Sequence, residues 1–149
     1  MRRFALMGFD SATATAIIYD AGTERFTGST LAGIGQAVVG VLQRPKETAN
    51  RFVSVMSIDT CQNELLAAFR AVTDKEWTVQ QSTTAALLAD GRAKKEEGKG
   101  GWILPLAVSM LYEPGKGRGR VAAGRAESDS ELLGVKEETA EEIVKKVLG

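Results

Sequence analysis

The chain has no histidine and only one cysteine, Cys61, among its 149 residues. Without histidine, neither a Ser-His-Asp nor a Cys-His nucleophile system can form. A single thiol cannot supply the usual ligands of a zinc site, so we expect no metal. It also cannot form an intrachain disulfide, which is typical of a reducing compartment. Any proton transfer would fall to Asp, Glu, Lys, Tyr or a bound cofactor, and the sequence identifies no catalytic residue.

Excess charge and long apolar runs are missing as well. The 19 basic and 19 acidic residues cancel to a formal net charge of zero, which gives no overall attraction to nucleic acid or acidic membranes. No apolar run approaches the ~20 residues of a membrane-spanning helix, and the N-terminus lacks the apolar stretch of a secretory signal. The 44% apolar and 26% charged residues are typical of a globular domain. We therefore expect a cytoplasmic protein that binds neither membranes nor nucleic acid.

Strand-like and helix-like segments alternate along the chain. Short β-branched or aromatic runs predict strands, and apolar residues at helical spacing predict helices that begin after Ser or Thr. The expected strands are 13–20, 24–28, 52–56 and 77–79. The expected helices begin near residues 30, 60 and 83, and two more cover 102–111 and 137–148. This alternation indicates an α/β fold.

Two of these helices have an apolar face that can be assigned residue by residue. In the helix before Pro45 the face consists of Leu31, Ile34, Val38, Val41 and Leu42. The same helix contains Gly33, Gly35 and Gly40, each costing up to ~1 kcal/mol relative to alanine, so we expect another backbone to pack closely there. In the C-terminal helix the face consists of Ala140, Ile143, Val144, Val147 and Leu148, with Glu141–Lys145 and Glu142–Lys146 as i,i+4 pairs.

Two dehydrogenase-like motifs are interpreted as chance matches. The segment 112–116 (YEPGK) fits the Y-x-x-x-K pattern, but Pro114 and Gly115 should break the helix that would align its two functional side chains. The segment 117–122 (GRGRVA) fits G-x-G-x-x-G/A, yet no buried strand precedes it and no amphipathic helix follows. No cofactor-binding residue is therefore identified.

The segment 115–130 is rich in glycine and charge and has no apolar period, so we expect a loop that a ligand or partner would order. Its basic residues, Lys116, Arg118, Arg120 and Arg125, would either contact phosphate or nucleic acid or be solvated and balanced by Glu127, Asp129 and Glu131. The second interpretation is favoured, because aromatic residues that would stack on single-stranded bases are missing.

Cys61, at a helix start, would either be reactive or simply pack, and packing is favoured.

Several segments, in a shared order, resemble the C-terminal half of the fungal NmrA-like and isoflavone-reductase-like proteins. The most informative is 44–79, and the likeness runs from about Phe4 to Leu148. The similar pieces are 7–10 (MGFD), 16–42, 45–55, 62–69 (QNELLAAF), 75–79 (KEWTV), 91–92 and 131–134 (ELLG). That family consists of NAD(P)-binding, atypical short-chain dehydrogenases that are longer than this chain.

The resemblance implies an α/β fold made of the C-terminal part of a Rossmann-like NAD(P)-binding fold and a small α/β substrate-binding region. The N-terminal βαβ dinucleotide unit would be lacking. Within a single domain, 1–149, residues 1–57 would be a remnant of the Rossmann-like sheet and 58–149 the substrate-binding region. Because 7–10 resembles the loop that enters the substrate cleft and 102–112 resembles its wall, the implied substrate-binding residues are Phe4, Met7, Phe9, Trp102 and Tyr112.

The implied function is that of an oxidoreductase using NADP or NAD on a small aromatic or polyketide-like molecule of secondary metabolism. Because the dinucleotide motif is absent, we expect a truncated form that contributes the substrate-binding half and is inactive alone. The alternative is a non-catalytic regulatory or protein-binding module of the same family. A protein partner, or self-association through the open sheet edge, is also expected.

Overall fold

The computed structural model describes residues 7–149 and shows an α/β arrangement with two small sheets. In the first sheet, β2 (Thr15–Tyr19) lies between β1 (Phe9–Asp10), which is antiparallel to it, and β5 (Thr78–Ser82), which is parallel. In the second, β3 (Phe26–Gly28) and β4 (Ile58–Thr60) are antiparallel. The predicted fold class is confirmed.

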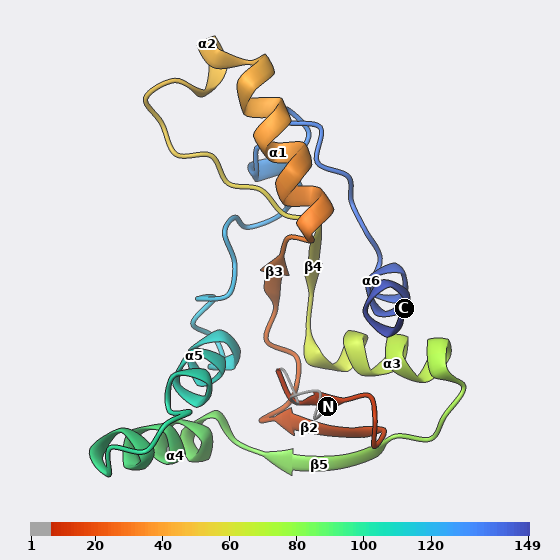
Figure 1. Cartoon of the computed structure of the whole chain (residues 1–149), viewed down its shortest axis with the longest axis vertical. Coiled ribbons are helices and arrows are strands. Elements are labelled where there is room, and N and C mark those ends of the chain that lie inside the picture. The colour runs from red at the N-terminus through yellow and green to blue at the C-terminus, as the bar shows by residue number, and fades with distance from the viewer. Residues whose placement is uncertain (1–6) are drawn as a thin grey trace.

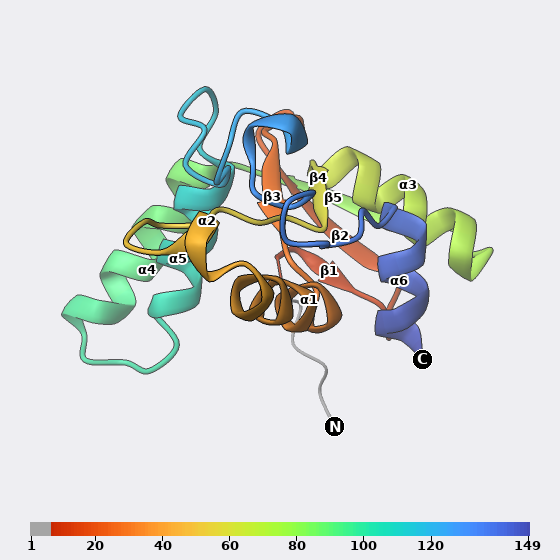
Figure 2. The same cartoon turned by 90° about the horizontal axis from the view of Figure 1, so that it is seen from above.

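The helices lie on opposite sides of these strands (Figure 1). They are α1 (Leu31–Gln43), α2 (Pro45–Thr48), α3 (Gln62–Thr73), α4 (Thr84–Glu96), α5 (Ile103–Tyr112) and α6 (Ala140–Leu148), with a 3-10 turn at Arg125–Glu127. Seen from above, α4 and α5 lie on one side and α3 and α6 on the other (Figure 2). None of the helices in the described part of the chain is long and apolar enough to cross a membrane.

Three apolar clusters hold these elements together. Between the first sheet, α3 and α6, the ring of Phe9 stacks on Phe69 at 5.2 Å between centroids, and Phe69 contacts Trp77 at 4.8 Å. Between β2, β3 and α5, the cluster consists of Tyr19, Phe26, Val108 and Tyr112. The third joins α1 to the C-terminal segment through Ala37, Leu133 and Val135. Phe9, a predicted substrate-binding residue, therefore lies in the first core.

Helix α1 exposes four of the five apolar residues that were expected to be buried, and Val41 alone of these five packs against the third cluster. Leu31 is 88% exposed and Leu42 is 75% exposed, and Ile34 and Val38 are also exposed. The helix is buried instead through Gly33, Ala37 and Gly40. A Cβ at Gly40 would lie 2.3 Å from the Leu133 carbonyl oxygen, so the predicted close backbone contact is confirmed there. The buried-face prediction was wrong because small residues allow closer packing than large ones.

Two other local predictions were wrong. The segment 52–56, predicted as a strand, has no ladder partner in the described structure, and Phe52 is 98% exposed. In α6 the predicted apolar face is confirmed at Val144, Ala140 and Leu148, which lie in or against the first cluster, whereas Val147 is 57% exposed. The predicted pairing of Lys146 is wrong. Lys146 pairs with Glu138 and not with Glu142, because the Glu142 carboxylate closes the capping box with Thr139 at the start of the helix.

Candidate functional site

A cavity of about 220 Å³ opens where the end of β2 meets α4 and α5. Its lining residues are Met7, Gly8, Tyr19, Leu87, Asp90, Lys94, Leu104, Pro105 and Val108. Most of these side chains are apolar, and the charged pair Asp90–Lys94 is joined at 2.6 Å. Apolar walls with a few polar groups are the usual composition of a small-molecule site. The cavity is therefore the candidate ligand site.

Tyr19 lines this cavity and stacks on Tyr112, which is not among the lining residues. The rings of Tyr19 and Tyr112 are 5.9 Å apart and nearly parallel, and Phe26 meets Tyr112 edge-on at 5.6 Å. Burial raises the pKa of Tyr19, and the negative charge of Asp90 adds to the effect. Burial also raises the pKa of Tyr112. Both phenols therefore stay protonated at neutral pH, and Tyr112 donates to the Met7 carbonyl oxygen at 3.2 Å.

Gln62 fixes the backbone around the cavity. Its side chain is almost completely buried at the start of α3. Oε1 accepts a hydrogen bond from the Tyr19 backbone N–H at 2.9 Å, and Nε2 donates to the carbonyl oxygens of Met7 at 3.2 Å and Ile17 at 3.1 Å. The sequence did not point to this residue, because a glutamine in the first turn of a helix is usually exposed and no local pattern distinguishes a buried one.

The backbone at Met7–Gly8 has an uncommon conformation. Met7 has φ +59° and Gly8 has φ +95°, and a side chain at Gly8 would meet the Ile17 carbonyl oxygen at 2.5 Å. Non-glycine residues at positive φ are uncommon and are concentrated at functional sites. The two hydrogen bonds from Gln62 and Tyr112 to the Met7 carbonyl oxygen hold this conformation.

The structure brings together two of the five predicted substrate-binding residues. Met7 lines the cavity and Tyr112 lies beneath Tyr19. Phe9 packs in the neighbouring core. Trp102 precedes α5, where Lys95 Nζ lies 5.3 Å from its ring centroid, and it is not among the lining residues. Phe4 lies outside the described residues. That any of these residues contacts a substrate stays a prediction.

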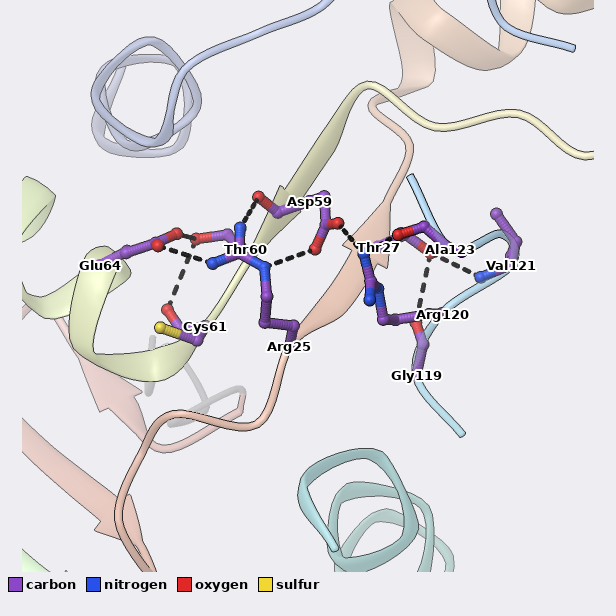
Figure 3. A network of polar contacts seen from close by, with 10 residues as sticks. All are labelled: Arg25, Thr27, Asp59, Thr60, Cys61, Glu64, Gly119, Arg120, Val121 and Ala123. Atoms are coloured by element: carbon purple, nitrogen blue, oxygen red, sulfur yellow. Dashed lines mark hydrogen bonds and ion pairs between the residues drawn. The ribbon is translucent and has the colours of Figure 1, made fainter. Parts of the chain in front are cut away.

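A network of ion pairs joins β3, β4, α3 and the glycine-rich loop (Figure 3). Arg25 binds Asp59 at 3.0 Å and Glu64 at 2.8 Å, and Arg120 from the loop binds the other oxygen of Asp59 at 2.6 Å. The Thr27 backbone N–H donates to the Gly119 carbonyl oxygen at 2.8 Å. The loop is thus held by the rest of the chain, without the ligand or partner that the sequence predicted.

Two of the four basic residues of this loop are paired with acids, but not with the predicted ones. Arg118 pairs with Glu113 at 2.5 Å, and Arg120 pairs with Asp59. Asp129, predicted to balance the cluster, instead binds Arg51 at 2.8 Å. Because their charges are paired within the chain, these arginines do not form a free anion-binding patch.

Glu64 provides a pH test of the network. The hydrogen bond from Arg25, with a further one from the Thr60 hydroxyl, lowers the pKa of Glu64. A lowered folded-state pKa contributes stability above the unfolded value of about 4.3, and this contribution is lost as the pH falls through the folded value. The Glu64 side chain is half-exposed, so we expect Glu64→Gln to lower the melting temperature at pH 6 by only about 1–3 °C.

The measurement is a thermal melt of the unchanged chain and of the Glu64→Gln variant, each at pH 6 and near pH 3. The difference between them should shrink toward zero at the lower pH. A difference of equal size at both pH values would mean that Glu64 acts through packing and not through its charge.

Neither dehydrogenase-like motif has the local structure that its function requires. Both motifs were correctly interpreted as chance matches: α5 ends at Tyr112, Gly115 has φ +70°, and no strand precedes the glycine-rich segment. The cavity at the end of β2, with a volume of about 220 Å³, is smaller than the roughly 300–1,000 Å³ of typical ligand sites.

Sequence comparison relates the chain to curated fungal oxidoreductases. No family model matches it. It is 57% identical over 148 residues to Oxidoreductase poxI from Penicillium oxalicum, covering 99% of this chain and 47% of that protein. It is 34% identical over 73 residues to Oxidoreductase aprR from Aspergillus flavus, covering 49% of this chain and 25% of that protein. The chain therefore spans no more than about half the length of the curated relatives it matches.

Solved structures show the same fold. A NADPH-dependent quinone oxidoreductase from Escherichia coli has a TM-score of 0.63 at 19% identity, covering 95% of this chain and 53% of that one. A nucleoside-diphosphate-sugar epimerase from Staphylococcus aureus has a TM-score of 0.62 at 18% identity, and the match covers 91% of this chain and 44% of the epimerase chain. At such low identity these likenesses establish the α/β fold alone.

Proposed function

We propose that the chain is the substrate-binding half of an NAD(P)H-dependent oxidoreductase of the NmrA-like or isoflavone-reductase-like type. Its substrate would be a small aromatic or polyketide-like molecule. The observation that carries the proposal is the apolar cavity at the stacked tyrosines, with a charged pair among its lining residues. The 57% identity to a curated oxidoreductase supports the reaction class.

The cavity is suited to a flat ring with an oxygen substituent. Leu87, Leu104 and Val108 supply the apolar surface against which a ring would pack. Tyr19 carries the one hydroxyl group among the described lining residues, and burial keeps it protonated. The Asp90–Lys94 pair adds a donor and an acceptor. These groups bind and orient a ligand, and none of them is assigned a chemical step.

The cofactor would be bound by residues outside those described. The geometry of the two dehydrogenase-like motifs supports this, because α5 ends at Tyr112 and no strand within residues 7–149 directly precedes the glycine-rich segment. We therefore expect the chain alone to bind an aromatic ligand without oxidising NADPH.

A thermal unfolding scan with 2-naphthol as the probe tests the ligand site. Binding to the folded state should raise the melting temperature as the probe concentration passes its Kd. Leu104→Trp fills the cavity and should remove this shift. Ile103→Trp is the matched control, because Ile103 is the adjacent residue on α5, is exposed and does not line the cavity.

Three results would contradict the proposal. One is a melting temperature that 2-naphthol leaves unchanged. Another is a shift that Leu104→Trp and Ile103→Trp reduce equally, because binding would then lie elsewhere. The third is a melting temperature raised by NADPH alone, which would place a cofactor site within this chain.

A non-catalytic protein-binding module is the second candidate, favoured by the exposed apolar face of α1. It predicts protein binding together with no response to 2-naphthol. The scan above therefore distinguishes the two candidates.

A further inference from the structure

Helix α1 has an apolar outer face that no described residue covers. The helix, LAGIGQAVVGVLQ, contains no charged residue. Its inner face is buried through small residues, and on the opposite side Leu31, Ile34, Val38 and Leu42 are between 48% and 88% exposed. A helix that is apolar all round is normally buried on all sides. The outer face of α1 therefore has the composition of an interface.

An extended segment with one free edge lies next in the chain after α1 and α2. On one edge of 52–56, the Ser54 backbone exchanges hydrogen bonds with Asp129: Ser54 N–H donates to the carboxylate at 2.9 Å, and the Ser54 carbonyl oxygen accepts from Asp129 N–H at 2.7 Å. Met56 N–H donates to the Ser130 hydroxyl oxygen at 2.9 Å. The N–H groups of the alternate residues, Val53 and Val55, have no partner within residues 7–149, and on this edge the Val55 carbonyl oxygen accepts one hydrogen bond, from the Ser29 hydroxyl at 3.2 Å.

This free edge explains why the predicted strand has no ladder. The sequence of 52–56 is strand-like, its backbone is extended, and one side is already bonded in the alternating pattern of a strand. An unpaired edge of this kind is a template for another strand. The residue before it, Phe52, is 98% exposed.

Both features lie at the same end of the molecule. Helix α1 and the segment that follows α2 extend beyond the β3–β4 pair, away from β2 and β5 (Figure 1). This is also the end away from the cavity between β2, α4 and α5. An occupant could therefore cover α1 and pair with the 52–56 edge without closing the ligand site.

We propose that the outer face of α1 and the edge of 52–56 form one docking surface for the remaining half of the relatives' polypeptide. That half would add a strand beside Val53 and Val55 and pack apolar side chains on Val38 and its neighbours. The lengths support this occupant: the chain covers 47% of the Penicillium oxalicum oxidoreductase, and 44% and 53% of the two similar structures. Each similar fold thus contains another part of about equal size.

Co-expression tests the proposal directly. The chain would carry an affinity tag, and its partner would be the part of the Penicillium oxalicum oxidoreductase that lies outside the 148 matched residues. Producing both together avoids requiring that the partner fold alone. The expected result is a 1:1 complex by light scattering.

Val38→Lys should weaken this complex by about tenfold or more, because a charge would be buried in an apolar contact. Val147→Lys is the matched control and should have no effect. Both valines are on helices and are similarly exposed, at 54% and 57%, but Val147 is on α6. Circular dichroism of each variant confirms that the chain still folds.

Hydrogen exchange provides a second measurement that requires no substitution. The Val53 and Val55 amides should exchange quickly in the chain alone and become protected in the complex. The Ser54 and Met56 amides should be protected in both. Three results would overturn the proposal. The first is a symmetric dimer of this chain formed through α1, and the second is a partner that is not captured. The third is equal weakening of the complex by both lysine substitutions. None of these results depends on which substrate the cavity binds.

Discussion

Replacing Gln62 with leucine is expected to lower the free energy of unfolding by about 3 kcal/mol. The substitution removes all three hydrogen bonds of a side chain that is 1% exposed. It leaves the Tyr19 backbone N–H without its partner in a buried position, and an unsatisfied buried group costs about 1–3 kcal/mol beyond the lost bonds. For a chain of this size, the melting temperature should fall by roughly 6–12 °C.

Asn63→Ala is the control for this measurement. The neighbouring Asn63 side chain donates to the Ala21 carbonyl oxygen at 3.0 Å, but in an exposed position, so water can replace the bond. Its cost should stay below about 1 kcal/mol. If both variants melted alike, Gln62 would not hold the cavity backbone.

The Gln62→Leu variant should also lose its response to 2-naphthol before it unfolds, because Met7 and Tyr19 are both positioned by Gln62.

Gly40→Ala should destabilise the chain by about 1–3 kcal/mol, although alanine is the better helix former. The added Cβ would lie 2.3 Å from the Leu133 carbonyl oxygen and 2.7 Å from the Leu133 Cα. These are backbone atoms, which cannot rotate away as a flexible side chain can. The helix would have to move outward, and overpacking of this kind costs about 1–3 kcal/mol. Urea unfolding with a constant m-value measures the change.

Gly35→Ala is the matched substitution in the same helix, and its effect should have the opposite sign. No atom lies within 4 Å of the position that its Cβ would occupy. Alanine should therefore stabilise α1 by up to ~1 kcal/mol. If both substitutions stabilised the chain, the close contact between α1 and Leu133 would not exist in solution.

The sequence predicted those elements that depend on local signals. Thr83 caps α4 as expected, α3 begins at Gln62, close to its expected start near residue 60, and α5 ends before Pro114. In each case the signals, which are an apolar period together with a nearby capping residue or proline, lie within a few positions of each other. The α/β class follows from the order of these elements and needs no knowledge of their packing.

The errors arose where a contact partner decides the outcome. The residues of 52–56 have strand propensity, but a ladder needs a second strand, and none pairs with them within residues 7–149. The apolar period of α1 identified its two faces but could not tell which one packs on this chain. Gln62 was missed because its three partners are 43 to 55 residues away along the sequence.

The two faces of α1 should also change differently over evolution. At Gly33, Ala37 and Gly40 the limit is volume, because Ser57 and Leu133 leave no room for a larger side chain at the two glycines. At Leu31, Ile34, Val38 and Leu42 the limit is polarity, and one large apolar residue can replace another. Among related sequences we therefore expect the inner positions to stay small while the outer positions drift among leucine, isoleucine, valine and methionine.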